Sequence, residues 1–164
     1  MKIWGWRMGM ITSNLKSLNL LECWFENDLT TRQRAAFPFY KSTGTKNLSV
    51  VYFEVEPGNS LGTHTDSAEE IILVLEGKAE ATVDNEKGEL TKGEMALIPN
   101  MVPHNIRNIG TETLKVVGFF SSPNVVSTFV EPLMPINQKA VGTPPIEGDR
   151  LMTWNEIFSK IVGN

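Results

Sequence analysis

Short β-strand patterns recur at intervals of about ten residues through the middle of the chain, and this spacing constrains the fold most strongly. Most of these patterns are rich in β-branched or aromatic residues and end near Gly, Pro or Asn. The predicted strands are Leu48–Glu56, Ile71–Glu76, Lys78–Asp84, Glu94–Ile98, His104–Asn108 and Leu114–Ser121, with a five-residue hairpin loop over Asp84–Gly88. No helical period separates them, so we predict an all-β sandwich or barrel.

The two flanks of this region are less regular. We predict one strand over Leu20–Glu26 and an edge segment over Ala36–Tyr40, because Pro38 has no amide hydrogen to donate to a sheet. Residues 131–150 are rich in Pro and Gly, which predicts an irregular tail. The expected division is therefore an N-terminal extension with edge strands (1–45), a barrel (46–130) and a tail with a closing helix (131–164).

The closing helix is predicted from apolar residues at helical spacing behind a capping box. Thr153 is the predicted N-cap and Glu156 takes the capping-box position. The apolar stripe comprises Trp154, Ile157, Phe158 and Ile161. We expect this stripe to pack on the barrel, and the alternative is a helix that binds a partner.

Charge and composition exclude several classes of function. The chain has 15 Lys and Arg against 19 Asp and Glu, and its basic residues form no long run, so nucleic acid is not an expected partner. Its longest apolar stretch, Ile71–Leu75, is far too short to span a bilayer, so no membrane partner is expected either. A single cysteine excludes a disulfide framework, and with no export signal at the N-terminus we expect a cytoplasmic protein.

The two histidines of the chain lie beside carboxylates in the predicted strands. Two imidazoles exclude a three-histidine site within one chain. His64 and Asp66 are two residues apart, so on a strand both side chains point to the same face. Glu70 follows at the head of the next strand, and His104 opens another strand after a loop bounded by prolines. Imidazole and carboxylate ligands in this mixture suit a divalent metal, as in the two-histidine, one-carboxylate sites of non-haem iron enzymes.

Two spaced motifs carry a resemblance to a known family. The stretch with Gly58, His64, Glu70 and Gly77 resembles the first motif of the cupin superfamily, G-x5-H-x-H-x3–4-E-x6-G. The stretch with Gly93, Pro99, His104 and Asn108 resembles the second, G-x5-P-x-G-x2-H-x3-N. The resemblance covers residues 48–121 and departs from the family at two positions, where Asp66 replaces the second histidine and Met101 replaces a glycine.

This resemblance implies both a fold and a metal centre. The fold is a double-stranded β-helix, or jelly-roll barrel, with irregular N-terminal strands and a short C-terminal helix. The family's ligand positions correspond to His64, Asp66, Glu70 and His104, which would hold a divalent ion such as Fe, Mn, Zn or Ni. Asp66 either ligates the metal, which favours the harder ions Fe(II) and Mn(II), or does not touch the metal and only orients His64. Met101 is expected in the wall of the pocket.

The function implied by the resemblance is that of a metal-binding cupin. We expect a metal-dependent enzyme, dioxygenase-like or isomerase-like, acting on a small oxygenated organic molecule that takes open positions on the metal. The alternative is a non-catalytic module that binds or senses a small molecule. An effector domain of a regulator is less favoured because no helix-turn-helix pattern is present. The resemblance also implies a homodimer formed through edge strands.

Several neighbouring residues are expected to lie outside the centre. Glu69 should point to the opposite strand face from Glu70, and Asn108 is expected to have a structural role. Cys23 is expected to be a small buried apolar residue. Arg32 and Arg34 are expected on an exposed edge, with a substrate patch as the alternative.

Overall fold

In the computed structural model, which describes residues 9–147 and 150–153, thirteen strands form one antiparallel sheet. The strands are β1 (Leu21–Phe25), β2 (Arg32–Phe39), β3 (Ser49–Val55), β4 (His64–Asp66), β5 (Glu70–Glu76), β6 (Lys78–Val83), β7 (Glu86–Thr91), β8 (Met95–Ile98), β9 (His104–Asn108), β10 (Leu114–Phe120), β11 (Val125–Met134), β12 (Gln138–Glu147) and β13 (Arg150–Thr153). All strands expected in the middle of the chain are present, and the all-β prediction is confirmed.

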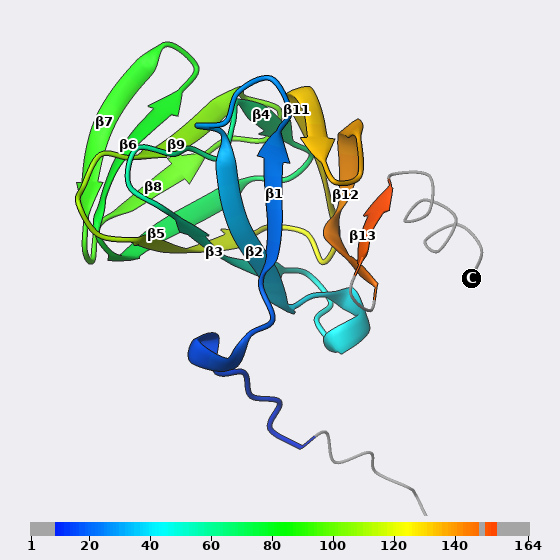
Figure 1. Cartoon of the computed structure of the whole chain (residues 1–164). Coiled ribbons are helices and arrows are strands. Elements are labelled where there is room, and N and C mark those ends of the chain that lie inside the picture. Colours follow the sequence, from blue (N-terminus) through cyan, green and yellow to red (C-terminus); the bar gives the residue numbers. More distant parts are fainter. Residues whose placement is uncertain (1–8, 148–149, 154–164) are drawn as a thin grey trace, which may run out of the picture.

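The sheet curls into a barrel around a main apolar core, and two smaller buried clusters lie beside it (Figure 1). Its strand order is β7-β6-β9-β4-β11-β1-β2-β3-β10-β5-β8, and β12 pairs with β11 and β13. Ala79 of β6 and Ile98 of β8 come from opposite ends of this order, yet both belong to the same buried cluster. The alternation of β5 explains how one strand serves the core, because Ile72 and Val74 are buried while Ile71 is exposed.

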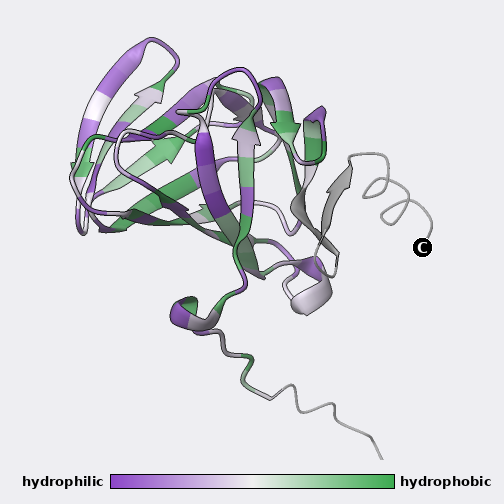
Figure 2. Cartoon of the chain, in the orientation of Figure 1, coloured by the Kyte–Doolittle hydropathy of each residue, from purple (hydrophilic) through white to green (hydrophobic). Residues whose placement is uncertain are grey.

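The hairpin after β6 differs from its prediction. Val83 pairs directly with Glu86, so the turn contains only Asp84 and Asn85 and the predicted five-residue loop is wrong. Asp84 adopts a positive φ of 52°, a conformation that aspartate tolerates in tight turns. The strand that follows, β7, is mostly exposed, and Figure 2 shows that it is largely hydrophilic. It was not predicted because it lacks the buried alternating residues that indicate a strand.

Strand β2 is longer and more central than the predicted edge segment. It pairs with β1 on one side and with β3 on the other, so it is not an edge strand. Its ladder with β3 shifts register between Ala36 and Phe39, where Pro38 lies. The missing amide hydrogen is therefore accommodated by an irregularity in the ladder rather than by an open edge.

The expected irregular tail also contains strands. β11 continues to Met134, and β12 returns beside it as its antiparallel neighbour. The β11–β12 ladder is interrupted between Thr128 and Leu133, and Pro132 lies within that gap. Proline in this stretch therefore shifts the pairing without preventing it.

Helical structure among the described residues consists of two short 3-10 turns, η1 (Leu15–Ser17) and η2 (Lys41–Thr43). In this part of the chain, no helix has the length and apolar character needed to cross a membrane. The predicted closing helix falls on residues 154–164, which lie outside the described residues, and its predicted N-cap Thr153 is the last residue of β13.

Candidate metal centre

The centre is built around a direct pairing of the two histidines across neighbouring strands. His64 in β4 is the register partner of His104 in β9, and their ring centroids lie 4.2 Å apart. Asp66 lies two residues beyond His64 on the same buried face of β4. The predicted juxtaposition of His64 and Asp66 is therefore confirmed, and the pairing of β4 with β9 adds His104 to the same face.

Backbone carbonyls orient both imidazole rings. Nδ1 of His64 lies 2.7 Å from the carbonyl oxygen of Gly62, and Nδ1 of His104 lies 2.9 Å from that of Val102. When each Nδ1 donates its proton to a carbonyl, each Nε2 keeps its lone pair. This tautomer is the one a metal ligand needs, and Nε2 of both rings faces the interior of the barrel.

Asp66 presents one carboxylate oxygen to the imidazoles and commits the other to the protein. Ser127 Oγ in β11 donates a short hydrogen bond to Asp66 Oδ1. Asp66 Oδ2 lies 3.2 Å from Nε2 of His104 and 3.5 Å from Nε2 of His64. The carbonyls of Gly62 and Val102 already bind the Nδ1 atoms. Asp66 Oδ2 therefore lies beside the Nε2 atoms, where it could ligate the same metal ion as they do.

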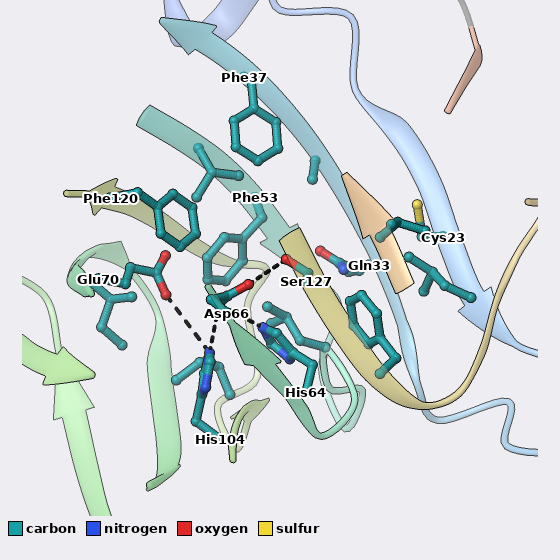
Figure 3. Close-up of a pocket in the computed structure, with 18 residues that line it drawn as sticks. Cys23, Gln33, Phe37, Phe53, His64, Asp66, Glu70, His104, Phe120 and Ser127 are labelled. Atoms are coloured by element: carbon teal, nitrogen blue, oxygen red, sulfur yellow. Dashed lines mark hydrogen bonds and ion pairs between the residues drawn. The ribbon is translucent and has the colours of Figure 1, made fainter. Parts of the chain in front are cut away.

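Glu70 reaches the same space from the other half of the barrel. It begins β5, and its Oε2 lies 3.9 Å from Nε2 of His104 (Figure 3). Gly118 in β10 leaves the room that the buried carboxylate occupies, since a Cβ at Gly118 would collide with Glu70 Oε1. Glu69 is exposed, as expected from the alternation of strand faces.

The donor atoms fit a single metal ion. One donor each from His64, Asp66 and His104 lie within 4.8 Å of one another, and all three residues are buried. An ion bonded at roughly 2.0–2.2 Å to each donor holds donors at about this separation. Among the described residues, Asp66 Oδ2 and His104 Nε2 are buried without a hydrogen-bond partner, which is costly unless something binds them.

The protonation states of the centre follow from burial and from mutual charge. Burial lowers the pKa of His64, but the Asp66 carboxylate, the Gly62 carbonyl and Glu70 together outweigh that effect, so the pKa is raised above its ordinary value. Burial opposes ionisation of Asp66, yet His64 and His104 hold its pKa well below its usual range. Burial, together with the negative charge of Asp66, raises the pKa of Glu70 to about 8. Asp66 is thus the ionised carboxylate of the pair.

The centre opens on an apolar cavity. Counted together with the part that is open to solvent, its empty space is about 640 Å³. Figure 3 shows the side chains of His64, Asp66, Glu70 and His104 converging, with the rings of Phe53 and Phe120 beside them and Phe37 farther away. Phe129 stacks on His64 with ring centroids 4.7 Å apart. The candidate metal donors therefore face a mainly apolar, partly open space.

Of the three neighbouring residues Met101, Asn108 and Cys23, the last two lie as predicted and the first does not. Met101 is 60% exposed and does not line the cavity, so the prediction that it forms part of the wall is wrong. Its φ of 61° explains why glycine suits that motif position. Asn108 is structural as expected, because its amide donates to the carbonyls of Val55 and Glu112. Cys23 is buried as predicted, which raises the pKa of its thiol to about 12, and it lines the cavity.

Sequence reasoning missed two polar residues of the site. Ser127 and Gln33 both line the cavity, from β11 and β2. Ser127 is 61 residues from Asp66 in the chain, so no local motif connects them. Gln33 has a signal that could have been used, since it alternates with Arg32 and Arg34 and therefore lies on the opposite strand face from them.

A family model matches the central part of the barrel. The family model of the cupin domain matches residues 51–120, a range that contains all four candidate ligands. The uncharacterized protein MJ1618 of Methanocaldococcus jannaschii is 47% identical over 51 residues, which make up 31% of this chain and 41% of that protein. The matched segment thus spans less than half of that relative.

Solved structures share the fold. Oxalate decarboxylase of Lactobacillus farciminis in a formate complex matches with a TM-score of 0.53 and 23% identity, over 56% of this chain and 29% of that chain. The cupin domain of Schizosaccharomyces pombe Cnp3 matches with a TM-score of 0.56 and 18% identity, over 68% of this chain and 74% of that chain. At these identities the likeness concerns the fold alone.

Proposed function

The barrel of this chain is a cupin domain, and we propose that its centre holds one divalent metal ion through His64, Asp66 and His104. Two buried atoms carry the proposal, because Asp66 Oδ2 and His104 Nε2 face each other without a hydrogen-bond partner beside an open cavity. A cation between them removes the cost of burying both atoms unsatisfied. Glu70 is the fourth ligand in this proposal and joins when the metal displaces its proton.

The ligand set favours hard ions. Two neutral imidazoles and two carboxylates balance the charge of a divalent ion, and carboxylate oxygens suit Fe(II) and Mn(II) better than softer ions. Ni and Zn are the weaker candidates. The hydrogen bond from Ser127 leaves Asp66 one oxygen for the metal, which keeps coordination positions open toward the cavity.

We propose that the protein is a metal-dependent enzyme acting on a small oxygenated molecule, in the manner of a dioxygenase or an isomerase. When bound, the metal supplies Lewis-acid or redox chemistry at its open positions. The carbonyls of Gly62 and Val102 and the hydroxyl of Ser127 orient the metal ligands. The phenylalanine rings exclude water from the cavity, and Glu70 can keep or release a proton. A small-molecule substrate thus lies between the metal and the apolar wall.

Metal analysis and activity together test this function. We expect near-stoichiometric Fe or Mn after anaerobic loading, its loss in His64→Ala and His104→Ala, and metal-dependent turnover or oxygen consumption with small enol or diol substrates. A matched control is available in Glu69→Gln, which alters an exposed carboxylate beside Glu70 and should keep full metal content. A protein that folds but binds no metal contradicts the proposed centre, and one that binds metal and ligand without turnover is a binding module.

A further inference from the structure

Among the described residues that line the cavity there is no lysine or arginine. Outside the metal cluster, the polar lining residues are Cys23, Gln33 and Ser127. Cys23 holds its proton because burial raises its pKa to about 12, and Ser127 donates to Asp66. Gln33 is therefore the described wall residue that offers a ligand both an amide donor and an amide acceptor.

The basic residues nearest in sequence to this wall are turned away from it. Arg32 and Arg34 alternate with Gln33 along β2, so they lie on the outer face of the barrel. There Arg32 pairs with Glu22 at 2.6 Å, and Arg34 pairs with Glu56 at 2.7 Å. Neither guanidinium is directed at a ligand in the cavity.

This arrangement disfavours an anionic ligand. The proposed ion is already balanced by two carboxylates, so a carboxylate or phosphate ligand would add an uncompensated negative charge to an apolar space. An uncharged ligand avoids this cost. It can bind the metal through carbonyl or hydroxyl oxygens and bury its apolar part against Phe37, Phe53 and Phe120.

We propose that this centre takes an uncharged, mainly apolar molecule with two neighbouring oxygens, and that Gln33 forms its hydrogen bond on the wall. This inference rests on the proposed function and narrows its substrate to a chemical class. Small dicarboxylates and phosphorylated sugars fall outside that class.

A pair of probes with one skeleton tests the charge of the ligand. Benzoylformamide and benzoylformate each offer two neighbouring oxygens and a phenyl ring, but only the second is an anion. A carboxylate oxygen is the better ligand for a hard ion in water, so the metal alone favours the anion. We expect calorimetry on the Mn-loaded protein to show benzoylformamide binding at least tenfold more tightly.

Two further measurements separate charge from apolar character. Pyruvamide lacks the phenyl ring and should bind at least tenfold more weakly than benzoylformamide. Gln33→Arg places a cation on the wall and should strengthen benzoylformate binding at least tenfold with unchanged metal content. Gln33→Met, of similar length and uncharged, is the matched control and should continue to reject the anion while binding the amide more weakly.

The outcomes for the proposed function and for the ligand class are distinct. A protein that binds no metal contradicts the proposed function, and the ligand class, which rests on the bound ion, is then contradicted with it. Equal or tighter binding of benzoylformate by the Mn-loaded, unaltered protein overturns the ligand class and leaves the proposed metal centre standing. Failure of both benzoyl probes to bind at millimolar concentration overturns it as well.

Discussion

Asp66 determines the charge of the centre, because it stands where the motif has a histidine. A histidine there would leave one carboxylate and three imidazoles around the ion, whereas Asp66 gives two of each. The carboxylate lies 3.2 Å from His104 Nε2 and is held by Ser127. Its identity as aspartate therefore affects both the affinity and the choice of metal.

Substitution of Asp66 should separate these two effects. Asp66→Asn removes the charge at constant shape and should weaken Mn(II) binding at least about 100-fold. Loss of a direct ligand should cost more affinity than loss of a residue that only hydrogen-bonds to a ligand. Asp66→His should instead shift preference from Mn(II) toward Zn(II) or Ni(II). Competitive metal titration measures both, and unchanged selectivity in Asp66→His would contradict a ligand role for Asp66.

Glu70 makes the metal-free protein sensitive to pH. Its ordinary pKa of 4.5 is raised to about 8 by burial and by Asp66, so between these values the native state holds a proton that the unfolded chain has released. This stabilising contribution is complete at low pH and is lost as the pH rises toward 8. The raised pKa of His64 acts in the same direction above its ordinary value of 6.5.

Melting temperatures in chelator at several pH values test this expectation. The unaltered protein should lose stability between about pH 5 and 8, and Glu70→Gln should lose less because it has no proton to release. Glu69→Gln, exposed and adjacent, should follow the unaltered protein. Identical pH profiles for Glu70→Gln and the unaltered protein would contradict a buried protonated Glu70.

At the scale of elements, β10 and β5 approach closely enough to need a glycine. A Cβ at Gly118 would collide with Glu70 Oε1 and would lie 2.8 Å from Val51 Cγ1. We expect Gly118→Ala to displace the carboxylate and to destabilise the protein by about 1–3 kcal/mol. Gly88→Ala in β7 is the control, because nothing lies within 4 Å of its Cβ position. Denaturant unfolding should show loss of stability only for Gly118→Ala.

At the scale of the whole molecule, the centre joins strands that are distant in the sheet order. β4 and β9 supply three donors, and β5 supplies Glu70 from the far side of the barrel. Metal binding should therefore stabilise the native fold by about 2.7 kcal/mol at a free metal concentration of 100 times Kd. Thermal unfolding with metal and then with excess chelator measures this gain, and an unchanged melting temperature would exclude tight binding to the native state.

The homodimer stays a prediction, and the structure offers a face on which to test it. Phe119, Ile71 and Leu97 are register neighbours across β10, β5 and β8, and their side chains are 42%, 43% and 56% exposed. We expect this apolar row to lie in the interface. Sedimentation should give a dimer for the unaltered chain and a monomer for Leu97→Asp, whereas a monomeric unaltered chain would contradict the prediction.

Most of the barrel could be predicted because its signals are local. A strand reveals itself by alternation over a few residues, as in β5, and a turn by its Gly or Pro. The exposed strand β7 escaped because it shows no buried alternating pattern. Strand β11 was missed as a whole, although Val125, Ser127 and Phe129 are buried in alternation with more exposed neighbours. The closing helix and the domain boundaries stay predictions.

The sequence by itself determined the strands predicted between residues 48 and 121, the small number of histidines, and the positions of His64, Asp66, Glu70 and His104 within two spaced motifs. Tertiary structure decided which atoms face one another. The pairing of β11 with β4 brought Ser127 to Asp66, and the packing of β10 beside β5 made Gly118 the space for Glu70. The curl of the sheet formed a cavity whose described lining has no lysine or arginine. These contacts join residues far apart in the chain, and strand pairing at that separation has no local sequence signal.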